Sequence, residues 1–355
     1  MSDATLFTPF TARGLTIDNR LWLSPMCQYS AVDGVPGDWH LVHLGARASG
    51  GFGLIFTEST AVLPDGRITT ADTGLWNDEQ EAAWARIVDF VHERGTPIGV
   101  QLGHAGRKAS IPVPWSGRSG TVPPEDGGWQ SISAGTDAFP GFARPRAATE
   151  GDLAEVVQAF ADSARRAVRA GFDAVEVLAG HGFLLHSFLS PLTKRRDDEF
   201  GLDRELLLFR VVRAVRDAIG RDIPLFVRLS ALDWVEGGVT VEDSAKTARA
   251  VKELGVDLVD ASSGGLVPAD IPLGPGDQVF AAEHIRAAAG VATGAVGLIT
   301  DPLEADRIVR EGRADVVSVA RQGLRDPAFG LRAAHELGAA ASSAWQPQYE
   351  RAVWA

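Results

Sequence analysis

The sequence predicts a single (β/α)₈ TIM barrel of the α/β class, and two observations carry this prediction. Short strand-like runs alternate with amphipathic helical stretches almost from end to end, which is typical of parallel strands joined by helical crossovers. No Gly-x-Gly-x-x-Gly opens the first unit, which disfavours an open dinucleotide-binding sheet. Eight such units in 355 residues therefore favour a closed barrel.

The expected elements follow from local periodicity. We expect strands at residues 21–24, 54–57, 98–102, 174–178, 225–229, 258–261, 292–296 and 316–319. Helices are expected at residues 78–94 and 152–170, where apolar side chains recur at three- and four-residue spacing. Gly95, Gly171 and Gly255 follow helices at positions where a left-handed cap is needed.

Three segments lie outside this repeating pattern of a single domain over residues 1–340. Residues 7–20 are expected to close the barrel floor as a hairpin. Residues 103–148 are too long for an ordinary strand-to-helix connection and predict an extended third βα loop. Its aromatic anchors favour a folded cap over the catalytic mouth rather than a disordered insertion. Residues 341–355 form an apolar C-terminal tail that we expect at a subunit interface.

Composition narrows the class of protein. The net charge of −12 without a compensating basic run argues against nucleic-acid or anionic-membrane partners. No apolar stretch reaches membrane-spanning length and no secretory signal opens the chain, so we expect a cytoplasmic protein. The single cysteine, Cys27, excludes an internal disulfide and a multi-cysteine metal site. His40 and His43 are interpreted as solvated or packing residues on a helix, so no metal is expected.

The ends of the strands should meet on one face of the barrel and form the site there. Small residues follow the last two expected strands at Gly294, Gly297 and Ala320, where they let backbone N–H groups approach a phosphate. Arg321 adds a positive charge at the same place. By itself this pattern indicates only a generic phosphate site.

The motifs at these strand ends, taken in order, resemble the old yellow enzyme family of FMN-dependent ene-reductases, in particular its bacterial thermophilic-like branch. The resemblance covers nearly the whole chain. Its motifs are Ser24-Pro25-Met26-Cys27-Gln28-Tyr29, Gln101 to Lys108, His181-Gly182, Phe188-Leu189-Ser190-Pro191, Ala292 to Gly297, Arg321 with Asp326-Pro327, and Gln348-Tyr349-Glu350-Arg351.

The resemblance implies FMN across the barrel mouth, with NADPH or NADH as reductant. Ser24, Pro25, Met26 and Ser59 would line the flavin ring, with Cys27 beside it. Gln101 would hydrogen-bond the pyrimidine edge, and Arg228 would stabilise negative charge at N1 and the C2 carbonyl. Two alternatives stay open, in which Arg228 is a core ion-pair partner and Cys27 a small buried hydrophobe.

Two departures from the family pattern affect catalysis. The family holds the substrate oxygen with a pair of donors three residues apart, but this chain has Leu178 at the first position and only His181 at the second. The tyrosine that protonates the substrate is replaced by Phe183. If an acid is needed, Tyr29, Tyr349 or water must supply it. A third departure, at residues 201–207, is interpreted as a change in loop packing.

The tail resembles a segment in which an arginine enters the partner subunit's active site. Arg351 stands at that position, which implies a homodimer or a dimer-based oligomer. The alternative is an arginine stacked on Trp354 of its own subunit.

The predicted function is an oxidoreductase that passes hydride from NAD(P)H through flavin N5 to the activated C=C of an enone-like substrate. A flavin-dependent desaturase, aromatising or isomerising enzyme is the alternative, because Phe183 cannot donate a proton. A flavin-binding sensor without efficient catalysis is another. A flavin-free lyase or aldolase is disfavoured because none of Lys108, Lys194, Lys246 and Lys252 directly terminates a strand.

Overall fold

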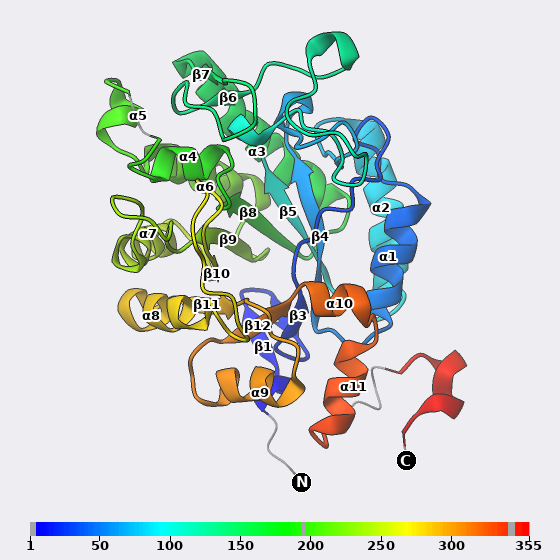
Figure 1. Ribbon diagram of the computed structural model, residues 1–355. Coiled ribbons are helices and arrows are strands. Elements are labelled where there is room, and N and C mark those ends of the chain that lie inside the picture. The colour runs from blue at the N-terminus through cyan, green and yellow to red at the C-terminus, as the bar shows by residue number, and fades with distance from the viewer. Residues whose placement is uncertain (1–4, 194–195, 340–344, 355) are drawn as a thin grey trace.

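The protein is a closed barrel of eight parallel strands surrounded by helices (Figure 1). The computed structural model describes residues 5–193, 196–339 and 345–354. Around the barrel the strands follow the order β3-β4-β5-β8-β9-β10-β11-β12, and β12 pairs with β3 to close the ring. Each of the eight expected strands is present, so the predicted fold class is confirmed.

The bounds of the elements differ from the expectations by a few residues at most places. The barrel strands are β3 (Leu21–Leu23), β4 (Leu54–Ala61), β5 (Ile98–Gly103), β8 (Ala174–Ala179), β9 (Leu225–Ser230), β10 (Leu258–Ser262), β11 (Ala292–Ala295) and β12 (Val316–Val319). The helices are α1 (Asp38–Ala48), α2 (Asp78–His92), α3 (Glu150–Arg169), α4 (Leu184–Leu189), α5 (Glu199–Leu202), α6 (Leu206–Ile219), α7 (Val241–Glu253), α8 (Val279–Ala289), α9 (Pro302–Arg310), α10 (Arg321–Arg325) and α11 (Phe329–Glu336).

Helix boundaries are set by capping residues. Helix α3 begins at Glu150, two residues before the expected start, because Thr149 and Asp152 form a capping box in which each side chain hydrogen-bonds the other residue's backbone N–H. After the C-terminal ends of helices α2, α3 and α7, the glycines adopt the expected left-handed φ, between +79° and +96°. They are Gly95, Gly171 and Gly255.

The barrel floor is closed by a hairpin, as expected. Strands β1 (Phe10–Ala12) and β2 (Leu15–Ile17) pair in antiparallel fashion below the barrel. The Phe10 ring packs edge-on against Trp22 at 5.6 Å, and Trp22 stacks on Phe226 at 5.7 Å. These rings fill the lower barrel interior, so the site must form at the opposite end.

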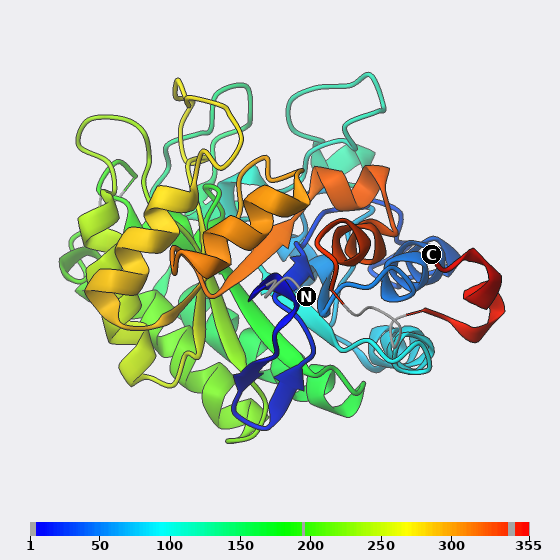
Figure 2. The same cartoon turned by 90° about the horizontal axis from the view of Figure 1, so that it is seen from below.

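The extended loop between β5 and α3 carries its own short elements and lies at that opposite end (Figure 2). They are η3 (Gly106–Lys108), η4 (Pro124–Asp126), β6 (Ile132–Ser133) and β7 (Arg146–Ala147), the last two paired with each other. Trp129 anchors the loop by donating from Nε1 to the Asp65 carbonyl at 2.8 Å. The loop is therefore folded, as the aromatic anchors predicted.

The tail lies on the outer flank of the barrel beside α11 (Figure 2). It contains η6 (Pro347–Ala352), and Trp354 stacks on His335 of α11 at 4.9 Å. Gln346 donates to the Arg94 carbonyl at 3.2 Å. Of the tail predicted over residues 341–355, residues 341–344 and 355 lie outside the described part of the chain.

Candidate active site

The phosphate site expected after the last two strands is a cavity of about 120 Å³ at the ends of β11 and β12. Gly297, Ala320 and Arg321 line it, and the loop backbone from Val296 to Thr300 forms one wall. Gly297 has φ +118°, and a Cβ there would lie 2.2 Å from Asp277 Oδ1, so only glycine fits. Gly294 instead lies inside β11 and is not part of the cavity lining.

Arg228 of β9 links this cavity to the barrel interior. Its Nη1 donates to Ser24 Oγ at 2.8 Å and lies 3.2 Å from Asp260 Oδ2. The core ion pair considered as an alternative is thus present, but the buried Nε of Arg228 has no partner among the described residues. A buried guanidinium with an unused donor fits a ligand that carries negative charge, as the reduced flavin does at N1.

A buried amide and carboxyl stand next to this arginine. Gln101 of β5 donates from Nε2 to Glu176 Oε1 at 2.6 Å, which leaves the Gln101 carbonyl oxygen to face a ligand. Burial, reinforced by the Asp260 carboxylate, raises the pKa of Glu176 to about 8. Glu176 therefore holds a proton over most of the neutral range.

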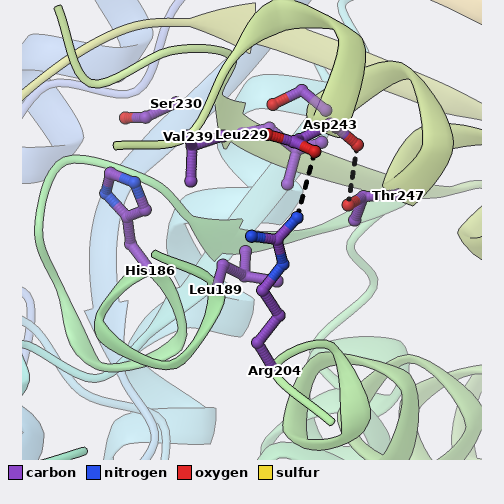
Figure 3. Close-up of a pocket in the computed structure, with 9 residues that line it drawn as sticks. His186, Leu189, Arg204, Leu229, Ser230, Val239, Asp243 and Thr247 are labelled. Carbon is purple, nitrogen blue, oxygen red and sulfur yellow. Dashed lines mark hydrogen bonds and ion pairs between the residues drawn. The ribbon is translucent and has the colours of Figure 1, made fainter. Parts of the chain in front are cut away.

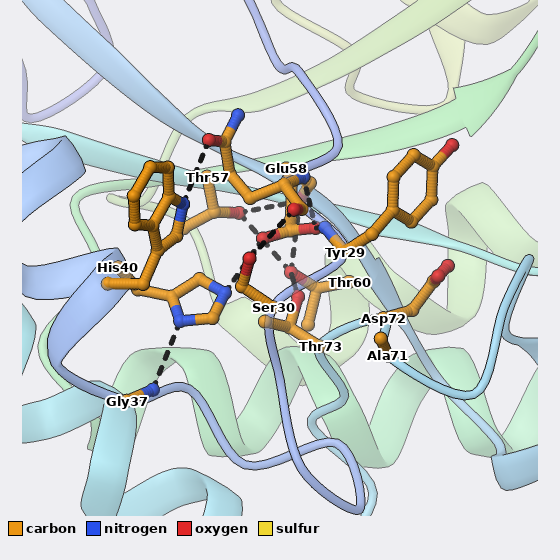
Figure 4. A network of polar contacts seen from close by, with 12 residues as sticks. Tyr29, Ser30, Gly37, His40, Thr57, Glu58, Thr60, Ala71, Asp72 and Thr73 are labelled. Carbon is orange, nitrogen blue, oxygen red and sulfur yellow. Dashed lines mark hydrogen bonds and ion pairs between the residues drawn. The ribbon is translucent and has the colours of Figure 1, made fainter. Parts of the chain in front are cut away.

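The loop after β3 carries Pro25, Met26, Cys27 and Tyr29. One carboxylate holds this loop at Tyr29 (Figure 4). Glu58 Oε2 accepts from the Gln28 N–H at 2.8 Å, and Tyr29 follows with a left-handed φ of +48°. Burial raises the pKa values of both the Cys27 thiol and the Tyr29 hydroxyl. Both groups are therefore protonated at neutral pH.

Ser59 stands beside Leu178 at this side of the site. A register shift between Phe56 and Ser59 marks a bulge in β4. The side chains of Ser59 and Leu178 both pack close to Gly103. A Cβ at position 103 would lie 2.7 Å from Ser59 Oγ and 3.4 Å from Leu178 Cδ2. Leu178 is buried on β8, at the position where the resemblance implies the first of two donors.

His181 follows β8 with a left-handed φ of +58°. The backbone N–H of His181 donates to Ser230 Oγ at 2.8 Å, and its backbone carbonyl accepts from Lys108 Nζ at 2.8 Å. Burial, with Arg228 and Lys108 nearby, holds the pKa of the imidazole well below its usual range. His181 is therefore a neutral side chain on a fixed backbone.

The buried histidine His186 supports the turn after His181. His186 Nδ1 accepts from the Gly182 N–H at 2.9 Å, and its Nε2 lies 3.2 Å from Asp233 Oδ1. Ser190 donates to the other Asp233 oxygen at 2.8 Å, which gives the serine of the Phe188 to Pro191 motif a structural role. His186 also borders a cavity of about 10 Å³ behind β9 (Figure 3), room for about one water molecule and too small for a substrate.

The mouth of the site is largely apolar. A small hydrophobic cluster there is formed by Ile68, Ala105 and Ala109, with Cys27, Tyr29, Ile111, Trp129 and Phe183 packed against it. Phe183 meets the His181 ring edge-on at 6.4 Å. His181 thus borders a mouth whose other side chains are mostly apolar, apart from the Cys27 thiol and the Tyr29 hydroxyl.

Tyr349 and Arg351 are not brought to this mouth. Both belong to η6 on the flank of the barrel, and the Tyr349 side chain is 56% exposed. Trp354 stacks on His335 rather than on Arg351. Their expected place in a substrate pocket would therefore require a second subunit.

Sequence reasoning missed the functions of three buried groups. Glu58 and His186 act through contacts distant in sequence, and no local motif marks them. Lys108 ends the motif that begins at Gln101 but receives no function from the sequence, although its Nζ donates to the carbonyls of His181 and Gly265. Burial lowers the pKa of Lys108 to about 8. Lys194, considered with it, lies outside the described residues.

No helix among residues 5–193, 196–339 and 345–354 is long and apolar enough to cross a membrane. Within the same part of the chain, no group of three or more His, Cys, Asp or Glu side chains is arranged to hold a metal ion.

Comparisons with known proteins agree with this geometry. The NADH:flavin oxidoreductase / NADH oxidase family matches residues 5–339. The NADPH dehydrogenase of Geobacillus sp. (strain WCH70) is 45% identical over 355 residues, and that of Bacillus subtilis (strain 168) is 43% identical over 350 residues, each match covering 98% of both chains. Among solved structures, morphinone reductase superposes with a TM-score of 0.79 at 26% identity, over 96% of this chain and 93% of that one. The chain therefore belongs to the old yellow enzyme family and is an FMN-dependent NAD(P)H oxidoreductase.

Proposed function

We propose that the enzyme reduces the C=C bond of an enone-like substrate with His181 as the single donor to the substrate oxygen. The observation that supports this proposal is the contrast within one site. The polar set of Arg228, Gln101 and Ser24 is suited to a flavin, whereas Leu178 and Phe183 place carbon where the family uses polar groups.

The chain's own residues would divide the work as follows. Bound FMN supplies hydride transfer from NAD(P)H to the β-carbon of the substrate. The neutral His181 donates a hydrogen bond to the oxygen on which charge develops. The α-carbon takes its proton from Tyr29 or from water, because Phe183 has none to give. The apolar mouth favours a substrate that is bulky and apolar around its carbonyl.

A second candidate is desaturation, aromatisation or isomerisation of a specialised substrate. Phe183 favours it, because a reaction of this kind need not deliver a proton to the α-carbon. The two candidates share the flavin and differ in what they do to an ordinary enone.

We also propose a homodimer in which Arg351 enters the partner's site. The exposed position of η6, away from its own mouth, supports this arrangement. The exposed aromatic surface of the tail would be covered in the same assembly.

The test is anaerobic stopped-flow spectroscopy on the FMN-loaded protein. Bleaching of the flavin by NADPH, followed by slow reoxidation with cyclohexenone and maleimide and faster reoxidation by larger apolar enones, is the expected result. Fast turnover of the small enones would contradict the specialised substrate. A flavin that NADPH fails to bleach would favour a non-catalytic role.

A further inference from the structure

The ring of His181 is engaged on one side only. Its Nε2 lies 2.8 Å from Ser262 Oγ at the end of β10. For Nδ1, the described parts of the chain offer no hydrogen-bond partner. Nδ1 is therefore the nitrogen available to a substrate oxygen.

A neutral imidazole carries one N–H, so its tautomer decides what Nδ1 can do. Because burial and the adjacent cations keep His181 neutral, two arrangements exist. If the proton is on Nε2, it is given to Ser262, and Nδ1 can only accept. If the proton is on Nδ1, it can stabilise a developing enolate oxygen, and Nε2 must then accept a hydrogen bond.

The Ser262 hydroxyl has two possible acceptors. One is His181 Nε2, and the other is Gln278 Oε1 at 3.2 Å. Gln278 Oε1 also receives the Ser263 hydroxyl at the shorter distance of 2.9 Å, and Ser263 itself accepts from Trp234 Nε1. When the Ser262 hydroxyl donates to His181 instead of Gln278, Gln278 Oε1 still accepts a hydrogen bond from Ser263. No buried polar group is then left without a partner by this rotation of the hydroxyl, so its free-energy cost is small.

We propose that Ser262 is a positioning residue whose hydroxyl donates to Nε2 of His181 and so keeps the proton on Nδ1 for the substrate oxygen. This inference rests on the proposed role of His181 as the single donor. It adds a requirement for that role, since with leucine at position 178 no second donor can compensate for the wrong tautomer.

The decisive measurement is the ¹⁵N NMR spectrum of the histidine rings in the FMN-loaded enzyme with p-hydroxybenzaldehyde bound. A phenolate oxygen is the probe for the enolate oxygen, and His181→Asn assigns the signal. The expected spectrum has the proton on Nδ1. A ring protonated on Nε2 in this complex overturns the proposal, whatever the enzyme's turnover.

Variants test the cause. Ser262→Ala should weaken probe binding on the order of 10- to 100-fold, as measured by the long-wavelength absorbance of the complex. Ser262→Thr keeps the hydroxyl and should restore most of the affinity. Ser263→Ala does not touch His181, yet it should shift the proton toward Nε2, because Gln278 then draws the Ser262 hydroxyl to itself.

The control is Ser244→Ala, another buried serine, which donates to the Ala231 carbonyl on the outer side of the barrel. It should leave both the spectrum and the affinity unchanged. Equal affinities of wild type and Ser262→Ala would contradict the proposal. If Ser262→Ala does not fold, the wild-type spectrum and Ser263→Ala decide. Failure of the wild type to bind FMN or to be reduced by NADPH would instead contradict the proposed function.

Discussion

His40 Nε2 of α1 lies 3.0 Å from Glu58 Oε1 of β4, with both side chains almost fully buried. The ring is oriented from behind, since its Nδ1 accepts from the Gly37 N–H at 3.0 Å. The other Glu58 oxygen accepts from Gln28. One buried carboxylate thus contacts a helix and the loop that carries Cys27 from its own strand (Figure 4).

Removal of this carboxylate should weaken the fold and expose the thiol. Glu58→Ala leaves the N–H of Gln28 without its acceptor and removes the contact with the His40 ring, so we expect a loss of about 1–3 kcal/mol in the free energy of unfolding in urea. Cys27 should also react faster with iodoacetamide, because Glu58 helps to keep its pKa high. Glu93→Ala, which breaks an exposed pair with Arg94, should cost about 1 kcal/mol or less. Equal effects of the two changes would contradict this role for Glu58.

Restoration of the family's polar groups should speed ordinary enone reduction. Leu178→His adds a second donor and should raise the rate of flavin reoxidation by cyclohexenone on the order of 10²-fold. Phe183→Tyr adds an acid and should raise it by roughly 10²-fold or more. Anaerobic stopped-flow measures both rates. Leu202→His, at a residue 85% exposed, is the matched control and should have no effect. Unchanged rates in both site variants would mean that other residues already supply these groups.

Glu176 should make stability depend on pH in a defined window. Its pKa is about 8 in the folded chain and 4.5 ordinarily, so the folded state binds the proton more tightly. The stability of wild type relative to Glu176→Gln should therefore fall as the pH rises from about 4.5 to about 8, by at most about 1.4 kcal/mol per pH unit. Asp260 and Arg228 face the same carboxyl and remain in both proteins. Urea unfolding at several pH values checks this, and a stability difference that stays constant would show that Glu176 does not titrate there.

Subunit mixing should reveal where Arg351 acts. In a hybrid of Arg351→Ala and His181→Ala chains, one site would combine an intact His181 with the Arg351 of the partner subunit. That hybrid should recover about half of the wild-type rate, although each parent is impaired. Separate tags on the two chains allow the hybrid to be purified and assayed. A hybrid no better than its parents would place Arg351 in its own subunit's site or outside any site.

The barrel could be predicted because its signals are local. Each strand is a short apolar run. The barrel interior below the site is filled by hydrophobic packing of Trp22, Phe226 and their neighbours. The candidate site residues could be named from the sequence where they lie at or near the end of a strand, as Arg228 does within β9 and His181 does after β8. Contacts such as His40 with Glu58 could not be foreseen, because they join elements whose distance depends on how the helices settle on the barrel. The place of Tyr349 was also beyond reach, since the motif gives its sequence neighbours but not the side of the molecule on which the tail lies.

The hydrogen bonds that hold His181 come from Ser230, Lys108 and Ser262, and none of them involves position 178 or 183. Exchange of the residues at those two positions therefore leaves these hydrogen bonds intact, although a change at Phe183 also removes its edge-on contact with the imidazole. For a protein engineer, this means that the residue proposed to bind the substrate oxygen and the residues proposed to select the substrate can be changed separately. Libraries confined to Leu178 and Phe183 should explore new substrates on an unchanged flavin platform.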